Sequence, residues 1–176
     1  KHIHKPSSKQ SWQQARDRLA FEEIFEIQIR VLRQKSLRET QSHNSYHVPF
    51  DPEAVKVDLA HLPFELTGAQ KKTLFQILKD LEKDRPAHRL VQGDVGSGKT
   101  MVGLMSMLMA IDNGFQACLM APTEILARQH EIGITEYVED LDIKVGFLSG
   151  TVKGKKRVKL LEELAAGEID ILIGTH

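Results

Sequence analysis

The feature that most constrains this chain is the run from Gly93 to Thr100, which matches the pattern G-x-x-x-x-G-K-S/T at every fixed position. A β-like run precedes it and an apolar helical run follows it. The glycines at 93, 96 and 98 let the backbone turn so that successive N–H groups face a phosphate, while the following helix adds its positive end. The alternative, a glycine-rich turn with a solvated lysine, is disfavoured by this context. The run therefore predicts a phosphate-binding loop.

The residues of this loop suit a magnesium-bound nucleotide. Lys99 is expected to reach the β and γ phosphates, and the Thr100 hydroxyl to hold Mg²⁺. These two are also the candidate catalytic residues of the chain. The predicted nucleotide ligands in the loop are Gly93, Asp94, Val95, Gly96, Ser97, Gly98, Lys99 and Thr100.

Short β-like runs alternate with helical runs in the second half of the chain. The expected strands cover residues 89–92, 117–121, 144–148 and 169–173, and helices are expected from residues 68, 98, 123 and 154. Such alternation predicts right-handed crossovers and a parallel sheet, which is an α/β fold.

The N-terminal part differs in pattern. Ser11 and Gln14 have the spacing of a capping box, and apolar residues at helical spacing predict an amphipathic helix over 11–35. Residues 41–52 lose this periodicity and predict a loop. We therefore expect a domain boundary near residue 50.

Composition gives no sign of a polyanion-binding net charge, a disulfide framework, a membrane span or a metal site. Lys plus Arg and Asp plus Glu both number 24, so any attraction to a polyanion must come from local patches. The single cysteine, Cys118, lies in an apolar run, so we expect a buried thiol and a reducing compartment. The longest apolar stretch, residues 101–111, is about half as long as a membrane-spanning helix.

No cysteine or carboxylate cluster lies near the histidines His2, His4, His43 and His47, so no metal-ligand set is expected.

Residues 64–70, Phe-Glu-Leu-Thr-Gly-Ala-Gln, lie just upstream of the loop. The Gln70 amide can donate and accept on an adenine edge, and the aromatic Phe64 can stack on a base. An alternative remains, because Thr67 and Gln70 also form a T-x-x-Q capping box. The two roles are compatible.

Residues 121–130, Ala-Pro-Thr-Glu-Ile-Leu-Ala-Arg-Gln-His, begin a predicted helix. Thr123 can cap it, leaving free N–H groups at a positive helix end that suits a phosphate. In the alternative interpretation, Thr123 only caps this helix and Glu124 only complements the positive end of its dipole.

Residues 148–157 place four cations, Lys153, Lys155, Lys156 and Arg157, at the start of another predicted helix. Cations there oppose the helix dipole unless an anion lies against them. DNA phosphate would supply that anion; a solvated basic face is the alternative.

Together, these segments resemble the first motor domain of the RecG family of superfamily 2 DNA helicases. Residues 64–70 resemble the adenine-recognising Q motif, residues 121–130 resemble motif Ia, and residues 174–176 resemble the family's T-x-H motif. Residues 15–25 are similar to the helical segment that joins the fork-binding wedge domain to the motor. The motor of the transcription-repair coupling translocase is the nearest alternative, and Ser97 and the upstream helix favour RecG.

The resemblance implies a P-loop NTPase fold of the RecA-like type, with residues 1–50 as a helical linker after the wedge domain and 51–176 as part of motor domain 1. It implies ATP and Mg²⁺ as cofactors, and an enzyme that remodels branched double-stranded DNA such as replication forks and Holliday junctions. It also implies a monomer in the bacterial cytosol, associated with the nucleoid, and a single-strand-binding protein as a partner. The implied DNA contacts are Thr123, Glu124, Arg128, Gly150, Lys153, Lys155, Lys156, Arg157, Thr175 and His176.

Both ends of the chain look cut from a longer protein. The family's acidic Mg²⁺-binding motif would follow His176, and its second motor domain supplies an arginine finger. We therefore expect this chain alone to bind nucleotide weakly and to hydrolyse it hardly at all. Two alternatives from other classes stay open: a nucleotide kinase-like protein that does not act on DNA, and an interaction module that docks a partner through the helix at 11–35.

Overall fold

The computed structural model describes residues 3–40, 47–60, 62 and 64–176. The chain forms two compact units, Lys1–Ser45 and Tyr46–His176. The assignment of residues 1–50 to a linker and 51–176 to a motor domain stays a prediction. Of the loop predicted over 41–52, residues 41–46 lie outside the described part of the chain.

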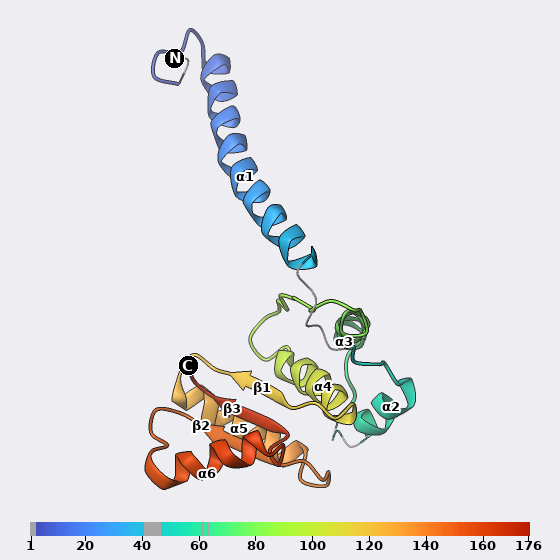
Figure 1. Ribbon diagram of the computed structural model, residues 1–176. Helices are drawn as coiled ribbons and strands as arrows, with labels where there is room; N and C mark the ends of the chain where they lie inside the picture. The colour runs from blue at the N-terminus through green and yellow to red at the C-terminus, as the bar shows by residue number, and fades with distance from the viewer. Residues whose placement is uncertain (1–2, 41–46, 61, 63) are drawn as a thin grey trace. The chain divides into compact units, whose positions relative to one another are not determined.

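The first unit is built on one long helix, α1 (Lys9–Thr40), as Figure 1 shows. The predicted helix is confirmed, but its predicted cap is wrong. Ser8 and Ser11 exchange hydrogen bonds: the Ser11 amide donates to Ser8 Oγ at 3.1 Å and the Ser8 amide to Ser11 Oγ at 3.1 Å. Because Ser8 offers the same three-residue spacing one turn earlier, the helix begins before Ser11.

A short helix that the sequence analysis missed opens the second unit. Helix α2 (Pro52–Ala60) follows Asp51, whose Oδ1 accepts from the Glu53 amide at 2.9 Å. Aspartate before a helix and proline at its first position are both favourable start signals. These signals were present in the sequence within a segment predicted as loop.

Two further helices precede the sheet: α3 (Gly68–Leu81) and α4 (Lys99–Asp112). They pack on each other, and Leu78, Leu104 and Met105 are each about 1% exposed. The methionines of α4 are mostly buried, so this helix serves the core.

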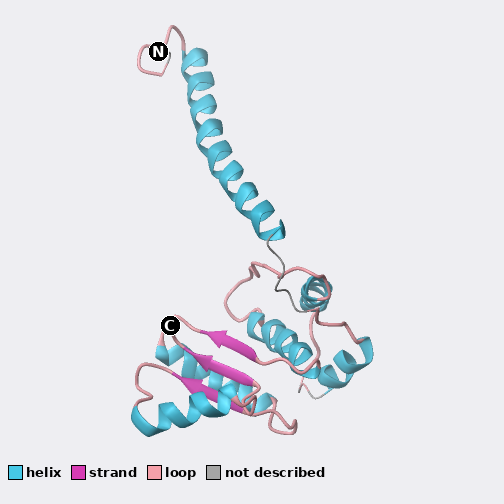
Figure 2. Ribbon diagram, viewed as in Figure 1, coloured by secondary structure: helices cyan, strands magenta, loops and turns pink. Residues whose placement is uncertain are grey.

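The sheet contains three parallel strands, β1 (Ala117–Met120), β2 (Val145–Leu148) and β3 (Ile171–Gly174), in the order β1-β3-β2. Figure 2 shows these strands beside the helices. Helix α5 (Glu124–Tyr137) connects β1 to β2, and α6 (Gly154–Ala165) connects β2 to β3. The α/β class with a parallel sheet, expected for a RecA-like domain, is therefore confirmed.

The two connecting helices lie on opposite faces of the sheet. On β2, the Phe147 ring faces α5, because the Arg128 guanidinium lies 3.5 Å from its centroid. The neighbouring Gly146 faces α6, because a Cβ there would lie 3.3 Å from Leu160 Cδ1. Successive residues of a strand point to opposite faces. This arrangement agrees with right-handed crossovers that run past β3 and then return to it.

Residues 89–92 and Cys118 differ from what the sequence predicts. The strand predicted over 89–92 is not a strand, because no backbone hydrogen bond joins it to another strand in the described chain. Leu90 is 83% exposed there. Cys118 is exposed rather than buried, because it points to the side of β1 opposite its half-buried neighbours Ala117 and Leu119.

Two further properties of the described residues concern membrane crossing and metal binding. None of their helices combines the length and the apolar character that crossing a bilayer requires. Nor do these residues include a group of three or more His, Cys, Asp or Glu side chains that could hold a metal ion. His2 and His43 lie outside the described part of the chain.

Candidate functional site

The loop before α4 adopts a conformation that requires glycine at two positions. Gly96 has φ +80° and Gly98 has φ +76°, which are left-handed values that other residues rarely adopt. A Cβ on Gly98 would also lie 2.2 Å from the side-chain nitrogen Nε2 of Gln70. A Cβ on Gly93 would lie 2.6 Å from Ser97 Oγ. The glycine spacing is therefore explained by this fold of the loop.

Lys99 lies at the mouth of this loop. Its Nζ donates to the carbonyl oxygens of Gly93 at 2.9 Å and Asp94 at 2.7 Å. Helix α4 begins at Lys99 with no side-chain cap and no acidic residue in its first turn, so its first amides lack side-chain acceptors. Lys99 and Thr100 are both exposed, as are most residues of the loop. The arrangement concentrates donors and positive charge at one solvent-accessible point.

Gln70 connects α3 to this loop. Its Nε2 donates to the Ser97 carbonyl at 2.9 Å, and its Oε1 accepts from the Thr67 amide at 2.7 Å. The Gln70 amide in turn donates to Thr67 Oγ1 at 3.3 Å, which completes the predicted capping box. An amide side chain has two N–H donors and two acceptor lone pairs, so one of each stays available for a base edge. The adenine role stays a prediction.

Phe64 does not join the loop. Its ring lies edge-on to Tyr137 at the end of α5, with the centroids 6.1 Å apart. The ring is 41% exposed. The structure therefore brings Gln70 to the phosphate loop but gives Phe64 a contact with another helix.

The three segments that contain the predicted DNA contacts, residues 121–130, 148–157 and 174–176, meet where the strands end. The Ala121 amide donates to the Gly174 carbonyl at 2.8 Å, and the Thr175 amide to the Leu148 carbonyl at 3.2 Å. Parallel strands end at the same edge of a sheet, so Thr123, Gly150 and His176 follow at that edge. Gly150 and His176 are exposed there, and Thr175 is half-buried.

Side chains join two of these segments directly. Glu124 Oε1 accepts from Thr151 Oγ1 at 2.6 Å, and Ser149 Oγ lies 2.7 Å from the same hydroxyl. Thr123 accepts from the Leu126 amide at 3.4 Å, so its predicted cap is confirmed. Glu124 therefore links the start of α5 to the turn after β2.

Arg128 is engaged within the protein. Its guanidinium stacks on Phe147 and pairs with Glu131 at 2.9 Å, and a second nitrogen lies 4.0 Å from Glu124. A direct contact of Arg128 with DNA would require some of these interactions to be exchanged. That contact stays a prediction, and the geometry favours a role in holding α5 against β2.

Unlike Arg128, the cations at the start of α6 are not engaged in ion pairs within the described chain. Lys153, Lys155, Lys156 and Arg157 are exposed, and in the described chain none of them forms an ion pair. The first turn of α6 holds no acidic residue, and Lys153 provides no side-chain cap. Four positive charges therefore lie at a positive helix end without a local anion, which suits an external polyanion.

One ionic cluster near the loop was missed from the sequence. Arg89 Nε donates to Asp80 Oδ2, and Lys83 Nζ donates to Asp80 Oδ1 at 2.6 Å. The hydrogen bonds from Arg89 and then Lys83 lower the pKa of Asp80 to about 2. An arginine four residues before the loop was the available signal, but its partner could not be chosen from several acidic residues nearby.

Comparisons with known proteins identify a helicase family. The model of the DEAD/DEAH box helicase family matches residues 67–176. The ATP-dependent DNA helicase RecG of Bacillus subtilis is 42% identical over 100% of this chain and 26% of its own length. RecG of Staphylococcus aureus strain NCTC 8325 is 44% identical over 99% of this chain and 25% of its own length. The chain thus spans about a quarter of the length of these relatives.

Solved structures give the same result. A structure of RecG bound to a three-way DNA junction matches 97% of this chain and 23% of that one, with 36% identity and a TM-score of 0.85. A hypothetical ATP-dependent RNA helicase from Sulfolobus tokodaii covers 71% of this chain and 34% of its own, with 22% identity and a TM-score of 0.52, which shows the fold alone. The chain therefore belongs to the DEAD/DEAH box helicase family, and the relatives that it resembles throughout its length are RecG helicases.

Proposed function

We propose that this chain is part of an ATP-dependent DNA helicase or translocase that remodels branched DNA, and that it carries phosphate binding and part of the DNA contact surface. The observation that carries the proposal is the loop at 93–98, with Lys99 at its mouth and the uncapped start of α4 behind it. Backbone amides at a helix start, together with a lysine, form a binding site for a polyphosphate. The family supports ATP as the nucleotide.

The residues present fit a magnesium nucleotide. The loop amides and Lys99 would hold the β and γ phosphates, and the Thr100 hydroxyl would be a ligand of Mg²⁺. Gln70 would face the adenine with the donor and acceptor that its contacts leave available. Magnesium would neutralise phosphate charge, while the protein groups would position the nucleotide.

The DNA part of the proposal depends on the edge where the three strands end. The RecG relative was solved with a three-way junction, which supports branched DNA as the substrate. The unpaired cations of α6 are the best candidates for phosphate contacts, with Thr123, Gly150, Thr175 and His176 at the same edge. We further propose that the whole protein is a monomer in the bacterial cytosol, associated with the nucleoid. A single-strand-binding protein is its proposed partner.

Equilibrium binding of a fluorescent ATP analogue with Mg²⁺ tests the nucleotide site. The parent chain should bind, with ATP competing better than GTP. Gln70→Ala should lose that preference for adenine, because an amide that reads a base edge contributes about 1 kcal/mol, or roughly fivefold. Binding of ATP and GTP with equal affinity by the parent would contradict the adenine role.

Thr67→Ala is the matched control for Gln70→Ala. It removes the hydroxyl that accepts from the Gln70 amide but leaves the Gln70 side chain in place. If capping alone explains Gln70, the two variants should behave alike. If Gln70 reads adenine, Thr67→Ala should keep the preference for ATP.

The DNA surface is tested by replacing Lys153, Lys155, Lys156 and Arg157 together with glutamine. Affinity for a three-way junction should fall, and the slope of log K against log salt should become less steep by about 1 for each lost phosphate contact. Fluorescence anisotropy over a salt series measures both quantities. The thermal unfolding midpoint should not fall, because these cations oppose the dipole of α6.

Removing four positive charges from another part of the protein controls for the effect of net charge on DNA affinity. Lysines 56, 71, 72 and 79 lie on α2 and α3, and replacing all four with glutamine removes the same charge. That variant should keep most of the affinity and the slope. Equal losses in both variants would mean that the α6 cluster is a solvated basic face.

A further inference from the structure

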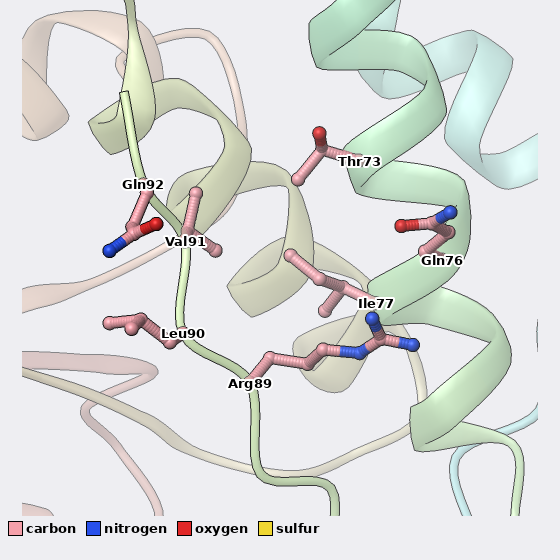
Figure 3. A pocket seen from close by; sticks show the side chains of 7 residues that line it. All are labelled: Thr73, Gln76, Ile77, Arg89, Leu90, Val91 and Gln92. Atoms are coloured by element: carbon pink, nitrogen blue, oxygen red, sulfur yellow. The ribbon is translucent and has the colours of Figure 1, made fainter. Parts of the chain in front are cut away.

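The segment that leads into the phosphate loop lies beside α3 with few backbone restraints. In the described chain, no backbone hydrogen bond joins residues 89–92 to any of the three strands. Figure 3 shows this segment alongside α3, with the Arg89 side chain reaching toward the helix. A hollow of about 220 Å³ separates the two, and its walls are Thr73, Gln76, Ile77, Arg89, Leu90, Val91 and Gln92.

Side chains of α3 contact the stretch from Arg89 to Ser97 at its two ends. Near the end of α3, Arg89 and Lys83 both donate to Asp80, whose side chain is only 15% exposed. Near its start, Gln70 donates to the Ser97 carbonyl at 2.9 Å. Residues 70 and 80 are about 15 Å apart along a helix that rises about 1.5 Å per residue. One rigid element therefore contacts both sides of the stretch that contains the phosphate loop.

The contact at Asp80 is a network of three charged groups and not an isolated ion pair. Two cations share one carboxylate, and hydrogen bonds between charged groups are about twice as strong as neutral ones. The bond to Asp80 also raises the pKa of Arg89. The pair therefore stays charged at neutral pH.

We propose that Asp80 is a positioning residue for the nucleotide site: through Arg89 it fixes the segment that enters the phosphate loop. Asp80 does not touch the nucleotide. It acts by limiting where Gly93 and Asp94 can lie, and their carbonyl oxygens are the groups that Lys99 contacts. This inference rests on the proposed nucleotide site.

The experiment compares Asp80→Asn with the parent chain by two readouts. Amide hydrogen exchange over residues 90–98 should speed up by about tenfold in the variant, and exchange in β3 should stay unchanged. Affinity for the fluorescent ATP analogue with Mg²⁺ should fall about fivefold to tenfold, because the loop must then be ordered on binding. Asp80→Glu keeps the carboxylate and should recover most of both values.

Glu82→Gln is the matched control. Glu82 pairs with Lys79 at 2.7 Å at the same end of α3, and in the described chain no ion pair joins it to the segment at 89–92. It should leave exchange over 90–98 and nucleotide affinity within about twofold of the parent. The combined exchange Asp80→Arg with Arg89→Asp restores a pair of opposite charges and tests the contact if Asp80→Asn folds poorly.

The outcomes separate this inference from the proposed function. Unchanged amide hydrogen exchange over 90–98 in Asp80→Asn would overturn the inference. So would amide hydrogen exchange in the charge-swapped variant that stays faster than in the parent chain, because that variant restores the ion pair. Faster exchange with unchanged affinity would also overturn it, because the contact would then be structural only. If the parent chain binds no ATP analogue, the proposed function fails, and the exchange rates alone decide whether Asp80 orders the loop.

Discussion

Lys99→Ala should lower the affinity for the ATP analogue by about 10-fold to 100-fold, because hydrogen bonds to charged groups contribute about 1.5–3 kcal/mol. The loss should depend on the phosphates: the difference between parent and variant should be large for ATP and ADP and small for adenosine. Isothermal titration with the three ligands in the presence of Mg²⁺ measures this dependence. The thermal unfolding midpoint should change little, since Lys99 is exposed.

The control for this experiment is Lys72→Ala. Lys72 is an exposed lysine on α3, and its removal makes the same change in net charge. Its affinity for ATP should stay within about twofold of the parent. An equal loss in both variants would mean that the nucleotide responds to the general field of the protein. A folded Lys99→Ala variant with parental affinity would show that the loop does not bind phosphate.

The regular elements from α3 onward could be predicted because their signals are local. Thr67 and Thr123 both cap the helices predicted to begin after them. The glycine spacing of the loop also follows from local backbone geometry, since Gly96 and Gly98 have positive φ. Signals of this kind depend on a few neighbouring residues, which the sequence displays directly.

Features that depend on a partner could not be predicted in the same way. Residues 89–92 have a strand-like pattern, but a strand also needs a neighbouring edge, and in the described chain this segment has none. The exposure of Cys118 depends on which face of β1 is covered. An apolar run alone does not identify that face.

In the candidate site, too, the residues could be predicted from local sequence signals but their distant contacts could not. The sequence identified Gln70, Glu124 and Arg128 by type and motif. It could not show that Gln70 reaches Ser97, that Glu124 accepts from Thr151, or that Arg128 stacks on Phe147. These contacts join residues 19 to 27 positions apart, so they exist only once the chain has folded and brought those segments together.

Gly174→Ala should destabilise the second unit by about 3 kcal/mol or more, at the upper end of what overpacking costs. A Cβ at this position would lie 2.0 Å from the Leu148 carbonyl oxygen and 3.0 Å from its carbon. These are backbone atoms of the neighbouring strand, so no side chain can rotate away. The Thr175 amide donates to the same Leu148 oxygen, and the Gly174 carbonyl accepts from the Ala121 amide. The added methyl must therefore push β2 and β3 apart where both strands end.

Gly133→Ala is the matched control for this change. Gly133 lies inside α5, which packs on the same sheet, and a Cβ there meets no atom within 4 Å. Alanine in a helix interior is more stable than glycine by about 0.5–1 kcal/mol, so this variant should unfold at a slightly higher temperature. Gly174→Ala should unfold roughly 6–12 °C lower, at about 2–4 °C per kcal/mol.

Because Gly174 lies between the segments at 121–124 and 148–151, a folded Gly174→Ala chain should also lose affinity for a three-way junction. Equal midpoints for the two variants would mean that β2 and β3 are not paired in the register that places Leu148 opposite Gly174.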